Sequence, residues 1–599
     1  MFIRFCFLSC CLSNALIAQP HLFVNQPYGE IIDRKIEIKV DGLSPFQKIE
    51  LRAEAQDQKG EVWSSHAFFQ ADNFGVVDVA TNPPLENSSY TTADSMGLFW
   101  SMLPSIGDAT PSFKCRNDTF SNQISLYVDG HLVEQTNTLR YLKAPDVQRI
   151  DVKENGLVGV LFIPKSEKPL PVIVTLSGSN GGLSENRAKL LASNGFAVLA
   201  LGYFGVDGLT PNLQDIPLEY FEKAFSWLKK QPNVDGSHIG LYGASRGAEL
   251  SLILGSMFPD SVQTIVAVVP SSVVYGGLGE APVHAWLYKG KPVAPFAPVP
   301  QTDFSDGKGQ TAENPANTRQ NFLEGMKDET AFTAGAIHVE NIRCPILLIS
   351  GGDDQMWPSE IYANQIMDRL KAQGSQIAAK HLYYPDAGHG INIPNLPIPS
   401  PTYYHPVSKL WFSMGGSREA DAKASVDAWD QLVTFFHETL KHSSSQEAVI
   451  MQNNLEKFSA LRQFNLPCDQ YAITGSGPLG IRNLKAIGDI DIIVTDELWN
   501  RLAAKYGIIN QNEVRKIVFP GGVVEAFREG SFSEEPFDNS APSVTSRIAN
   551  AEIIEGLPFD SMETILYYKR KAPREKDLKD IHLIEGWMKM NTKQTNQNL

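Results

Sequence analysis

Hydrophobic and polar residues alternate along the N-terminal part of the chain. In Ile36-Glu37-Ile38-Lys39-Val40 and Ile49-Glu50-Leu51-Arg52-Ala53 every second side chain is apolar, and Gly, Pro, Asn and Asp separate such runs. Successive side chains of a strand point to opposite faces, so this pattern is typical of strands buried on one face only. Short strands at this spacing predict an Ig-like β-sandwich over residues 19–147.

Between residues 148 and 441 the alternation gives way to continuous apolar runs. These runs are Val172–Leu176, Ala197–Leu201, Ile239–Tyr242, Ile265–Val269 and Ile346–Ser350. Segments with helical periodicity, such as Leu218–Lys229, lie between them. Strands without polar alternation are buried on both faces, which predicts a parallel sheet covered by helices. Residues 270–335 are rich in Pro, Gly and Asn, and we interpret them as an insertion that forms a lid or wall over the site.

A polar segment, His442-Ser443-Ser444-Ser445-Gln446, follows the parallel sheet. It opens a linker and connecting helix over residues 442–464. A third unit over 465–590 and a frayed tail over 591–599 come next. A chain of 599 residues is too long for one hydrophobic core, which agrees with several domains.

Composition and charge exclude several classes of protein. Hydrophobic residues make up 43% and charged residues 20% of the chain, which is ordinary for a globular protein. The net charge of -15 argues against a nucleic-acid partner or an anionic membrane surface. No apolar run is long enough for an integral membrane segment. Three of the 6 cysteines lie in the first eleven residues, and the others are far apart, so the spacing predicts neither a disulfide framework nor a zinc site.

The first 18 residues have the pattern of a signal peptide. Arg4 precedes a run rich in Phe, Leu, Cys and Ile, and the small residue Ala18 stands before Gln19. A basic start, a short apolar stretch and a small residue are typical of a cleaved export signal, and a buried N-terminal strand is the alternative. Export would place the protein in the periplasm or outside the cell, whereas the substrates that the candidate sites imply suggest the cytoplasm. The pattern therefore leaves the localisation open.

The segment Gly243-Ala244-Ser245-Arg246-Gly247 is a G-x-S-x-G motif. It follows an apolar strand and precedes a helical segment, which is the context that a nucleophile elbow requires. The glycines permit the strained turn and the close passage of helix and strand. A hydroxyl is a weak nucleophile and needs an adjacent base. Ser245 is the predicted nucleophile.

The acid and the base of a hydrolase triad are expected later in the chain, in that order. The strand Ile346–Ser350 runs into Gly351-Gly352-Asp353-Asp354, where the G-x-x-D spacing favours Asp354 as the acid and Asp353 as its neighbour. A second strand, His381–Tyr384, leads to His389, which suits the general base.

An oxyanion hole needs two N–H donors near the nucleophile. The first is the backbone N–H of Arg246, directly after Ser245, and the second should come from the glycine-rich loop 177–182. We choose Ser179 as this second donor, although an ordinary strand-to-helix turn would have a similar sequence.

Several further segments carry a family resemblance. They are Asp41-Gly42-Leu43-Ser44-Pro45, Ser95–Trp100, Gly195–Ala200, Leu218–Phe221, Gly243–Leu250, Asp353-Asp354 followed by Trp357, Ala428-Trp429 and Phe435-Phe436. With them, residues 25–440 resemble the acyl-CoA thioesterase and bile acid-CoA:amino acid N-acyltransferase family. Its members pair an N-terminal β-sandwich with an α/β-hydrolase domain.

The resemblance implies a reaction and a substrate. Conjugating enzymes of this family use cysteine and its thioesterases mostly serine, so Ser245 implies hydrolysis of an acyl-CoA thioester to free acid and CoA, without a cofactor. The alternatives are a carboxylesterase or peptidase-type serine hydrolase and an acyl-CoA N-acyltransferase. A nucleotide-sensing protein with the hydrolase as scaffold is an alternative of another class.

The third unit carries a second set of candidate residues. Gly475-Ser476 follows an apolar strand, and Asp489 and Asp491 project to one face of a later strand, with Glu525 as a third carboxylate. Carboxylates on one face suit a divalent cation. The arrangement resembles the nucleotidyltransferase superfamily, an α+β fold. The resemblance implies that Gly475 and Ser476 contact nucleotide phosphates and that the carboxylates hold magnesium. A solvated strand edge is the alternative.

Overall fold

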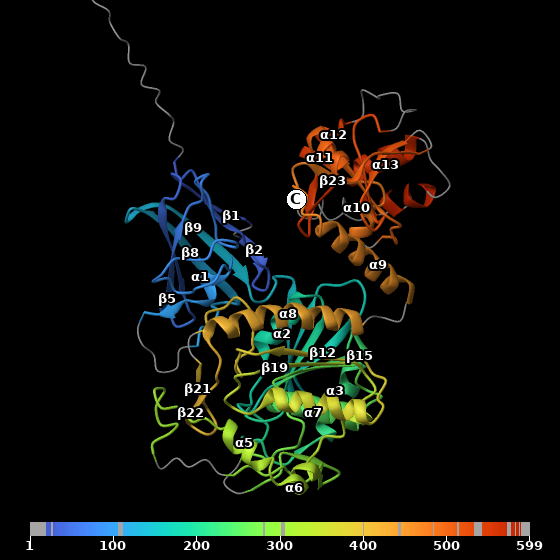
Figure 1. Ribbon diagram of the computed structural model, residues 1–599. Coiled ribbons are helices and arrows are strands. Elements are labelled where there is room, and N and C mark those ends of the chain that lie inside the picture. The colour runs from blue at the N-terminus through green and yellow to red at the C-terminus, as the bar shows by residue number, and fades with distance from the viewer. Residues whose placement is uncertain are drawn as a thin grey trace, which may run out of the picture. The chain divides into compact units, whose positions relative to one another are not determined.

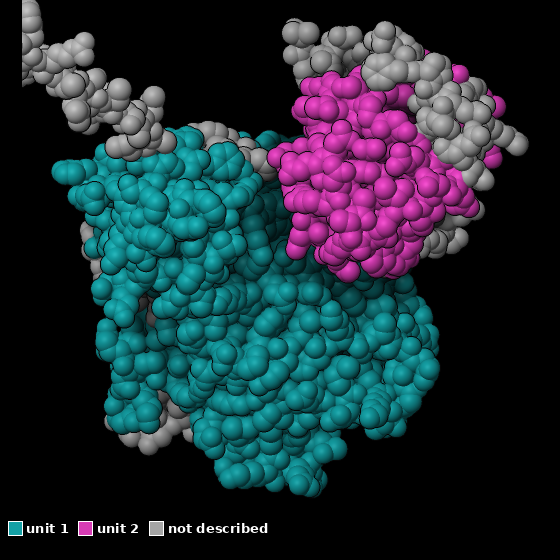
Figure 2. All heavy atoms as spheres, turned by 45° about the horizontal axis from the view of Figure 1, so that its top comes forward, with its two compact units in different colours: residues 1–441 teal, residues 442–599 magenta. Residues whose placement is uncertain are grey.

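The computed structural model divides into two compact units, residues 1–441 and 442–599 (Figures 1 and 2). It describes residues 19–25, 28–105, 112–278, 282–300, 306–398, 401–440, 445–482, 484–511, 514–531, 542–571, 577–581, 583–585 and 587–588. The expected signal peptide and the tail over 591–599 lie outside these residues. Within the described ranges, no helix has both the length and the apolar character needed to cross a bilayer.

The N-terminal part of the first unit contains two sheets, with strand orders β2-β9-β8-β4-β5-β7 and β1-β3-β6. Their strands are β1 (His21–Val24), β2 (Tyr28–Ile31), β3 (Ile38–Asp41), β4 (Lys48–Gln56), β5 (Val62–Gln70), β6 (Val77–Asp78), β7 (Leu103–Pro104), β8 (Thr119–Val128) and β9 (His131–Tyr141). Burial alternates along β4, because one face of the larger sheet packs on the core. The long strands β4, β5, β8 and β9 pair antiparallel, whereas β2 runs parallel to β9.

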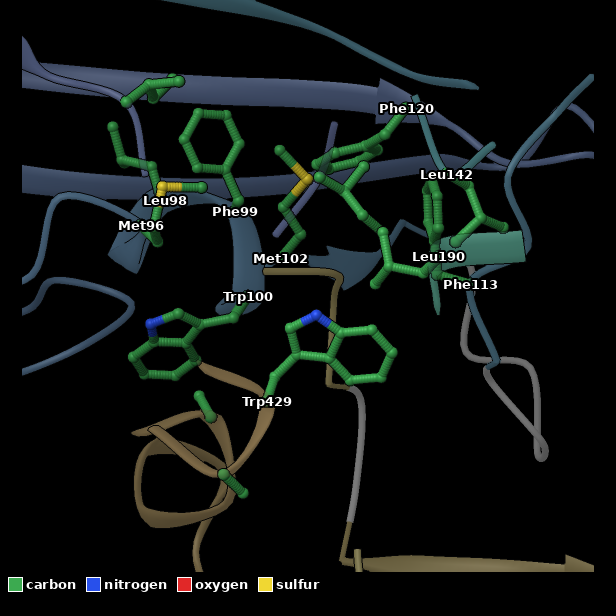
Figure 3. Close-up of a cluster of buried hydrophobic side chains, with 14 of the residues drawn as sticks. Met96, Leu98, Phe99, Trp100, Met102, Phe113, Phe120, Leu142, Leu190 and Trp429 are labelled. Atoms are coloured by element: carbon green, nitrogen blue, oxygen red, sulfur yellow. The ribbon is translucent and has the colours of Figure 1, made fainter. Parts of the chain in front are cut away.

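One hydrophobic cluster joins these sheets to the rest of the unit. It contains Phe99 and Trp100 of the short helix α1 (Gly97–Trp100) and Trp429 of the long helix α8 (Arg418–Thr439) (Figure 3). The Trp429 indole N–H donates to Asp33 Oδ2 at 2.9 Å, so the buried polar group has a partner. The N-terminal sheets therefore share a core with the domain that follows.

The central sheet has the strand order β10-β11-β13-β12-β15-β16-β19-β20. Its strands are β10 (Val147–Glu154), β11 (Leu157–Pro164), β12 (Leu170–Leu176), β13 (Ala197–Gly202), β15 (Val234–Ala244), β16 (Thr264–Val268), β19 (Ile346–Gly351) and β20 (Ala379–Tyr384). From β13 to β20 all neighbours are parallel. The expectation of a purely parallel sheet is wrong at the other edge, where β10 and β11 run antiparallel. Asn155 and Gly156, with φ of 54° and 73°, form the tight turn between them.

Helices cover both faces of this sheet. They are α2 (Glu185–Ser193), α3 (Glu219–Leu228), α4 (Arg246–Met257), α7 (Ser359–Ala372) and α8. Successive strand residues alternate between two clusters: Ile173 packs with α2 and α8, whereas Val172 and Val174 pack with α3, α4 and α7. The continuous apolar runs of the sequence reflect this burial on both faces.

The insertion between β16 and β19 contains β17 (Trp286–Tyr288), β18 (Lys291–Pro292), α5 (Arg319–Gly325) and α6 (Glu329–Ala334). Its residues Val273, Tyr275 and Phe322 pack against Trp357, which follows β19. A further hairpin, β21 (Thr402–His405) and β22 (Leu410–Ser413), lies before α8 and has no counterpart in the sequence-based prediction.

The second unit is built on a seven-stranded mixed sheet of order β25-β26-β27-β24-β23-β29-β28. Its strands are β23 (Tyr471–Ile473), β24 (Ile490–Val494), β25 (Ile509–Gln511), β26 (Val514–Val518), β27 (Val524–Phe527), β28 (Glu552–Ile554) and β29 (Leu557–Phe559). Its helices are α9 (Ser445–Arg462), α10 (Gly477–Ile481), α11 (Asp496–Tyr506), α12 (Val544–Ala549) and α13 (Met562–Lys571).

Candidate active site

Ser245 stands in the sharp turn between β15 and α4. Its backbone has φ 56° and ψ −122°, a conformation that non-glycine residues rarely adopt and that is typical of strained functional turns. A Cβ added at Gly243 would lie 2.0 Å from the Gly247 carbonyl oxygen, and one added at Gly247 would lie 2.5 Å from the carbonyl oxygen of Leu176. Both glycines of the motif are therefore required by close packing, and the turn presents Ser245 at the carboxyl edge of the sheet.

His389 and Asp354 are joined by a buried hydrogen bond. His389 Nδ1 lies 2.8 Å from Asp354 Oδ2, and the two side chains are 7% and 0% exposed. Asp354 Oδ1 accepts the backbone N–H groups of Met356 at 3.0 Å and Trp357 at 3.2 Å. Both carboxylate oxygens of Asp354 thus have hydrogen-bond donors, which hold the side chain in one orientation. Because Asp354 Oδ2 accepts a hydrogen bond from Nδ1–H, Nε2 of His389 is left as the ring nitrogen that can take a proton.

Trp357 connects His389 to the neighbourhood of Ser245. Its ring meets His389 edge to face at 5.8 Å between centroids, and its indole N–H donates to the Val269 carbonyl at 3.2 Å. The preceding carbonyl, that of Val268, accepts the Ser245 N–H at 2.9 Å. Among the described residues, no hydrogen bond joins the Ser245 hydroxyl to His389. In an enzyme without substrate this contact is often long.

Asp353 has different partners from Asp354. Its Oδ2 accepts the Gly416 N–H at 2.9 Å, and its Oδ1 accepts the Gln355 amide at 2.5 Å. These bonds tie the loop after β19 to the segment before α8. Of the two adjacent aspartates, it is Asp354 that contacts His389.

The loop 177–182 passes directly beside the nucleophile. A Cβ added at Gly178 would lie 3.5 Å from Ser245 Cβ and 3.3 Å from the Ala244 carbonyl oxygen. Arg246 is the first residue of α4, and the first N–H groups of a helix lack partners within it. The Arg246 N–H and the loop 177–182 therefore both lie beside Ser245.

The Arg246 side chain has a separate, structural environment. Its guanidinium donates to the carbonyl oxygens of Gly276 and Tyr275 at 2.9 Å each and pairs with the buried Glu249 at 3.1 Å. Burial raises the pKa of the Glu249 carboxyl, and the positive charge of Arg246 opposes this rise. The side chain thus ties the insertion to the nucleophile helix, which sequence reasoning did not foresee.

Two further titratable residues near the site were missed by sequence reasoning. His405, at the end of β21, places Nε2 2.9 Å from Ser179 Oγ, and burial lowers its pKa to about 4. Asp421, in the first turn of α8, accepts the Gly388 N–H at 2.8 Å. Burial raises the Asp421 pKa to about 7, and the nearby Asp354 and Asp353 add to the rise. Neither residue stands in a local motif, so their positions depend on tertiary packing.

The second unit brings its predicted carboxylates together. One oxygen each of Asp489, Asp491 and Glu525 lies within 4.8 Å of the others, and Asp491 pairs in register with Glu525 on the parallel strand β27. Glu525 also pairs with Lys516, whose Nζ lies 2.8 and 2.9 Å from its two oxygens. No pattern in the sequence indicated a role for this lysine.

The predicted phosphate-binding pair lies next to this cluster. Gly475 has φ 62°, and a Cβ there would lie 2.5 Å from Asp491 Oδ2. Ser476 is the residue before α10, a helix of 5 residues. The loop therefore closes over Asp491.

Comparison with known proteins gives clear matches for the first unit. The family described as BAAT / Acyl-CoA thioester hydrolase C terminal matches residues 216–442, and Acyl-CoA thioester hydrolase/BAAT N-terminal region matches residues 33–154. Acyl-coenzyme A thioesterase 6 of Mus musculus is 34% identical over 420 residues, which cover 68% of this chain and 94% of the relative. Mitochondrial acyl-coenzyme A thioesterase 2 of Homo sapiens is 34% identical over 429 residues, covering 70% and 83%.

Solved structures give weaker likenesses. The acylaminoacyl peptidase of Pyrococcus horikoshii is 14% identical and covers 69% of this chain and 61% of that chain, with a TM-score of 0.31. Esterase Est22 is 16% identical and covers 49% and 82%, with a TM-score of 0.29. At these TM-scores the likenesses carry no argument about function.

Proposed function

The chain belongs to the acyl-CoA thioester hydrolase/BAAT family of hydrolases, and from this premise we propose that Ser245, His389 and Asp354 hydrolyse an acyl-CoA thioester. The proposal is carried by the buried His389–Asp354 hydrogen bond of 2.8 Å, together with the elbow conformation of Ser245. A serine, a histidine and an acid with these contacts form the arrangement that acyl transfer requires.

The first half of the reaction transfers the acyl group to the enzyme. His389 Nε2 takes the proton of the Ser245 hydroxyl as Oγ attacks the thioester carbonyl carbon. The carbonyl oxygen becomes an oxyanion, which the Arg246 N–H and the loop of Ser179 stabilise. When the tetrahedral intermediate collapses, the C–S bond breaks and the CoA sulfur receives the proton from His389. Asp354 stabilises the imidazolium that exists between these two transfers.

The second half releases the acid. His389 Nε2 removes a proton from a water molecule, whose oxygen attacks the ester carbonyl carbon of the acyl-enzyme. The bond from carbon to Ser245 Oγ breaks, and His389 returns the proton to Oγ. The net reaction consumes one water and gives a carboxylic acid and CoA. Each step uses residues of this chain only.

Replacement of Ser245 by alanine tests the proposal. We expect kcat for CoA release from an acyl-CoA to fall by about 10³-fold or more, because triad members act as a unit. The matched control is Ser256→Ala on the same helix, which should keep wild-type activity. A Ser245→Ala enzyme that retains a tenth of the activity would overturn the assignment. Faster turnover of p-nitrophenyl esters than of acyl-CoA would favour the carboxylesterase alternative.

For the second unit we infer a nucleotidyltransferase-like domain that binds Mg²⁺. Carboxylate oxygens are the ligands that Mg²⁺ prefers, and Asp489, Asp491 and Glu525 bring one such oxygen each within 4.8 Å of the others. Glu525 is also paired with Lys516. When bound, the ion would neutralise the phosphates of a nucleotide held at Gly475 and Ser476. Calorimetry of the full chain with Mg²⁺ and each nucleoside triphosphate tests this. A higher melting temperature of this unit supports the inference, and no shift with any triphosphate rejects it.

Two interpretations from the sequence stay proposals. We interpret the two N-terminal sheets as a β-sandwich that supports the hydrolase, because both contribute to one core. We also propose that residues 1–18 are removed on export. N-terminal sequencing of the purified protein tests the latter: a start at Gln19 supports it, and a start at Met1 contradicts it.

A further inference from the structure

His405 is held in one orientation and one tautomer. The residue is 4% exposed, and its ring contacts those of Tyr403 and Phe412 at 5.9 and 6.0 Å between centroids. The backbone N–H groups of Val407 and Ser408 donate to Nδ1, with nitrogen separations of 3.3 and 3.2 Å. Because Nδ1 accepts, the ring hydrogen of the neutral imidazole is on Nε2. Burial lowers the pKa to about 4, so the ring is neutral near pH 7.

This tautomer determines what the Ser179 hydroxyl can do. His405 Nε2–H donates to Ser179 Oγ across 2.9 Å, so Oγ is the acceptor in this bond. A hydroxyl has one hydrogen and two lone pairs, and the Ser179 hydrogen is therefore left to donate elsewhere. Within the described part of the chain, no acceptor takes that hydrogen.

Ser179 belongs to the loop that passes beside the nucleophile. It directly follows Gly178, where an added Cβ would be 3.5 Å from Ser245 Cβ. The Ser177 carbonyl accepts the buried Tyr203 hydroxyl at 2.5 Å, which fixes the loop at its first residue. The loop is thus anchored on one side by Tyr203 and on the other by His405, with its backbone against the nucleophile.

The hairpin that carries His405 is anchored to the insertion. The Trp411 N–H donates to the Gly309 carbonyl at 2.8 Å, and the Ser413 N–H donates to the Ala316 carbonyl at 2.9 Å. His405 lies on β21 and contacts the loop 177–182, while the partner strand β22 is bonded to the insertion. Such support from a second layer of hydrogen bonds is what keeps a donor in its productive direction.

We propose that the Ser179 hydroxyl donates a hydrogen bond to the thioester carbonyl oxygen and to the oxyanion that replaces it, and that His405 is the positioning residue that directs this hydroxyl. The inference rests on the proposed role of Ser245 as nucleophile. It adds a side-chain donor to the backbone N–H groups of the oxyanion hole. A donor that gains strength as charge develops raises kcat more than it lowers KM.

Steady-state kinetics with an acyl-CoA test the role of Ser179. We expect Ser179→Ala to lower kcat by about 10- to 10²-fold with KM within about threefold, whereas Ser179→Thr, which keeps a hydroxyl, should retain most of the activity. Ser184→Ala, near the same loop, is the matched control and should equal the wild type. A Ser179→Ala enzyme with wild-type kcat, or equal losses in the alanine and threonine variants, would overturn the proposal.

A double-mutant cycle tests the role of His405. We expect His405→Ala to lower kcat, His405→Gln to restore part of it through an amide donor, and His405→Ala in the Ser179→Ala background to have no further effect. A full additional loss in that background would show that His405 acts only by holding the hairpin, and would overturn its positioning role. If His405→Ala does not fold, the Ser179 pair still decides the proposal.

The failure of this inference is distinguishable from failure of the proposed function. If Ser245→Ala is inactive while both Ser179 variants have wild-type kcat, only the oxyanion donor is wrong. If Ser245→Ala is active, the nucleophile itself is wrong and the role of Ser179 falls with it.

Discussion

Carboxylates gather in both units of the molecule, but their surroundings differ. In the first unit Asp354 is fully buried, one oxygen facing His389 and the other two backbone N–H groups. In the second unit Asp489 is exposed, Asp491 and Glu525 are partly exposed, and their oxygens converge within 4.8 Å. Lys516 compensates the charge of Glu525.

The two surroundings suit different tasks: that of Asp354 suits a residue that orients its neighbour, and that of Asp489, Asp491 and Glu525 concentrates negative charge. A buried carboxylate with a directed donor on each oxygen orients its partner and stabilises a positive charge on it. Carboxylates that converge repel one another unless a cation screens them. The first arrangement gives each oxygen of one carboxylate a directed donor, whereas the second brings three carboxylates together beside one lysine.

The largest expected effect concerns the two adjacent aspartates of the first unit. Asp354→Asn should lower kcat by about 10³- to 10⁴-fold, because the amide cannot hold the same His389 tautomer or stabilise the imidazolium. Asp353→Asn is the matched control and should stay within about tenfold, since its amide oxygen can still accept the Gly416 N–H. Thiol-release kinetics measure both variants. Equal losses would contradict the distinction drawn between these neighbours.

A smaller effect is expected at a buried ion pair network of the second unit. Asp580 accepts Lys485 at 2.8 Å and Lys569 at 2.7 Å, and its side chain is nearly buried. Asp580→Ala removes the acidic partner of Lys485 and one of the two partners of Lys569, which keeps Asp577, and should destabilise this unit by about 2 kcal/mol. Calorimetry should show the loss, with thioesterase activity unchanged and the exposed Asp469→Ala as control. A parallel loss of hydrolase activity would show that the two units are coupled.

Asp421 should make the stability of the first unit depend on pH. Its pKa is raised by burial from 3.8 to about 7, so between these values the folded state holds a proton that the unfolded state has lost. The free energy of unfolding should therefore fall as pH rises from about 4 to about 7 and level off above, by at most about 4 kcal/mol in total.

The variant Asp421→Asn isolates this contribution. It should melt near the wild type at pH 5 and above it at pH 8, because the neutral amide keeps an acceptor for the Gly388 N–H. Asp386→Asn, an exposed change on the neighbouring loop, should leave the pH dependence as it is. Identical pH profiles for wild type and Asp421→Asn would refute a protonated Asp421 in the folded state.

The smallest expected effect concerns Lys516, the lysine paired with Glu525 in the second unit. Lys516→Met frees Glu525, so the three carboxylates repel more strongly and Mg²⁺ should stabilise this variant more than the wild type, by about 1 kcal/mol. The further changes Asp489→Asn and Asp491→Asn should remove the dependence on Mg²⁺. Melting curves with and without Mg²⁺ provide the measurement. If Mg²⁺ does not change the melting temperature of Lys516→Met, the three carboxylates form a solvated strand edge and not a metal site.

Local patterns predicted the strands that carry the candidate site. Apolar runs such as Val172–Leu176 fall within β12 because burial on both faces is recorded in consecutive residues. The turn at Gly243–Gly247 could also be predicted. The close contacts that require its glycines are made within the motif itself and with the adjacent strand β12. The spacing before Asp354 agrees with its contact to His389.

Contacts between distant segments could not be predicted in this way. The bond between His405 and Ser179 joins residues 226 positions apart, and no spacing rule connects them. Asp421 looks like an ordinary acidic residue in the first turn of a helix, and only tertiary packing buries it. The antiparallel edge of the central sheet differs from these contacts, because it depends on a local signal. Asn155-Gly156 is a dipeptide typical of a tight hairpin turn, and it joins β10 to β11.

The central claim, that Ser245 accepts the acyl group, is tested most directly by locating that group on the enzyme. The protein is mixed with an acyl-CoA, quenched in acid within the first turnover and digested, and the peptides are weighed by mass spectrometry. The account predicts an acyl ester on Ser245, formed together with released CoA and absent from Ser245→Ala. An acyl group on a different residue, or full turnover in Ser245→Ala, would contradict it.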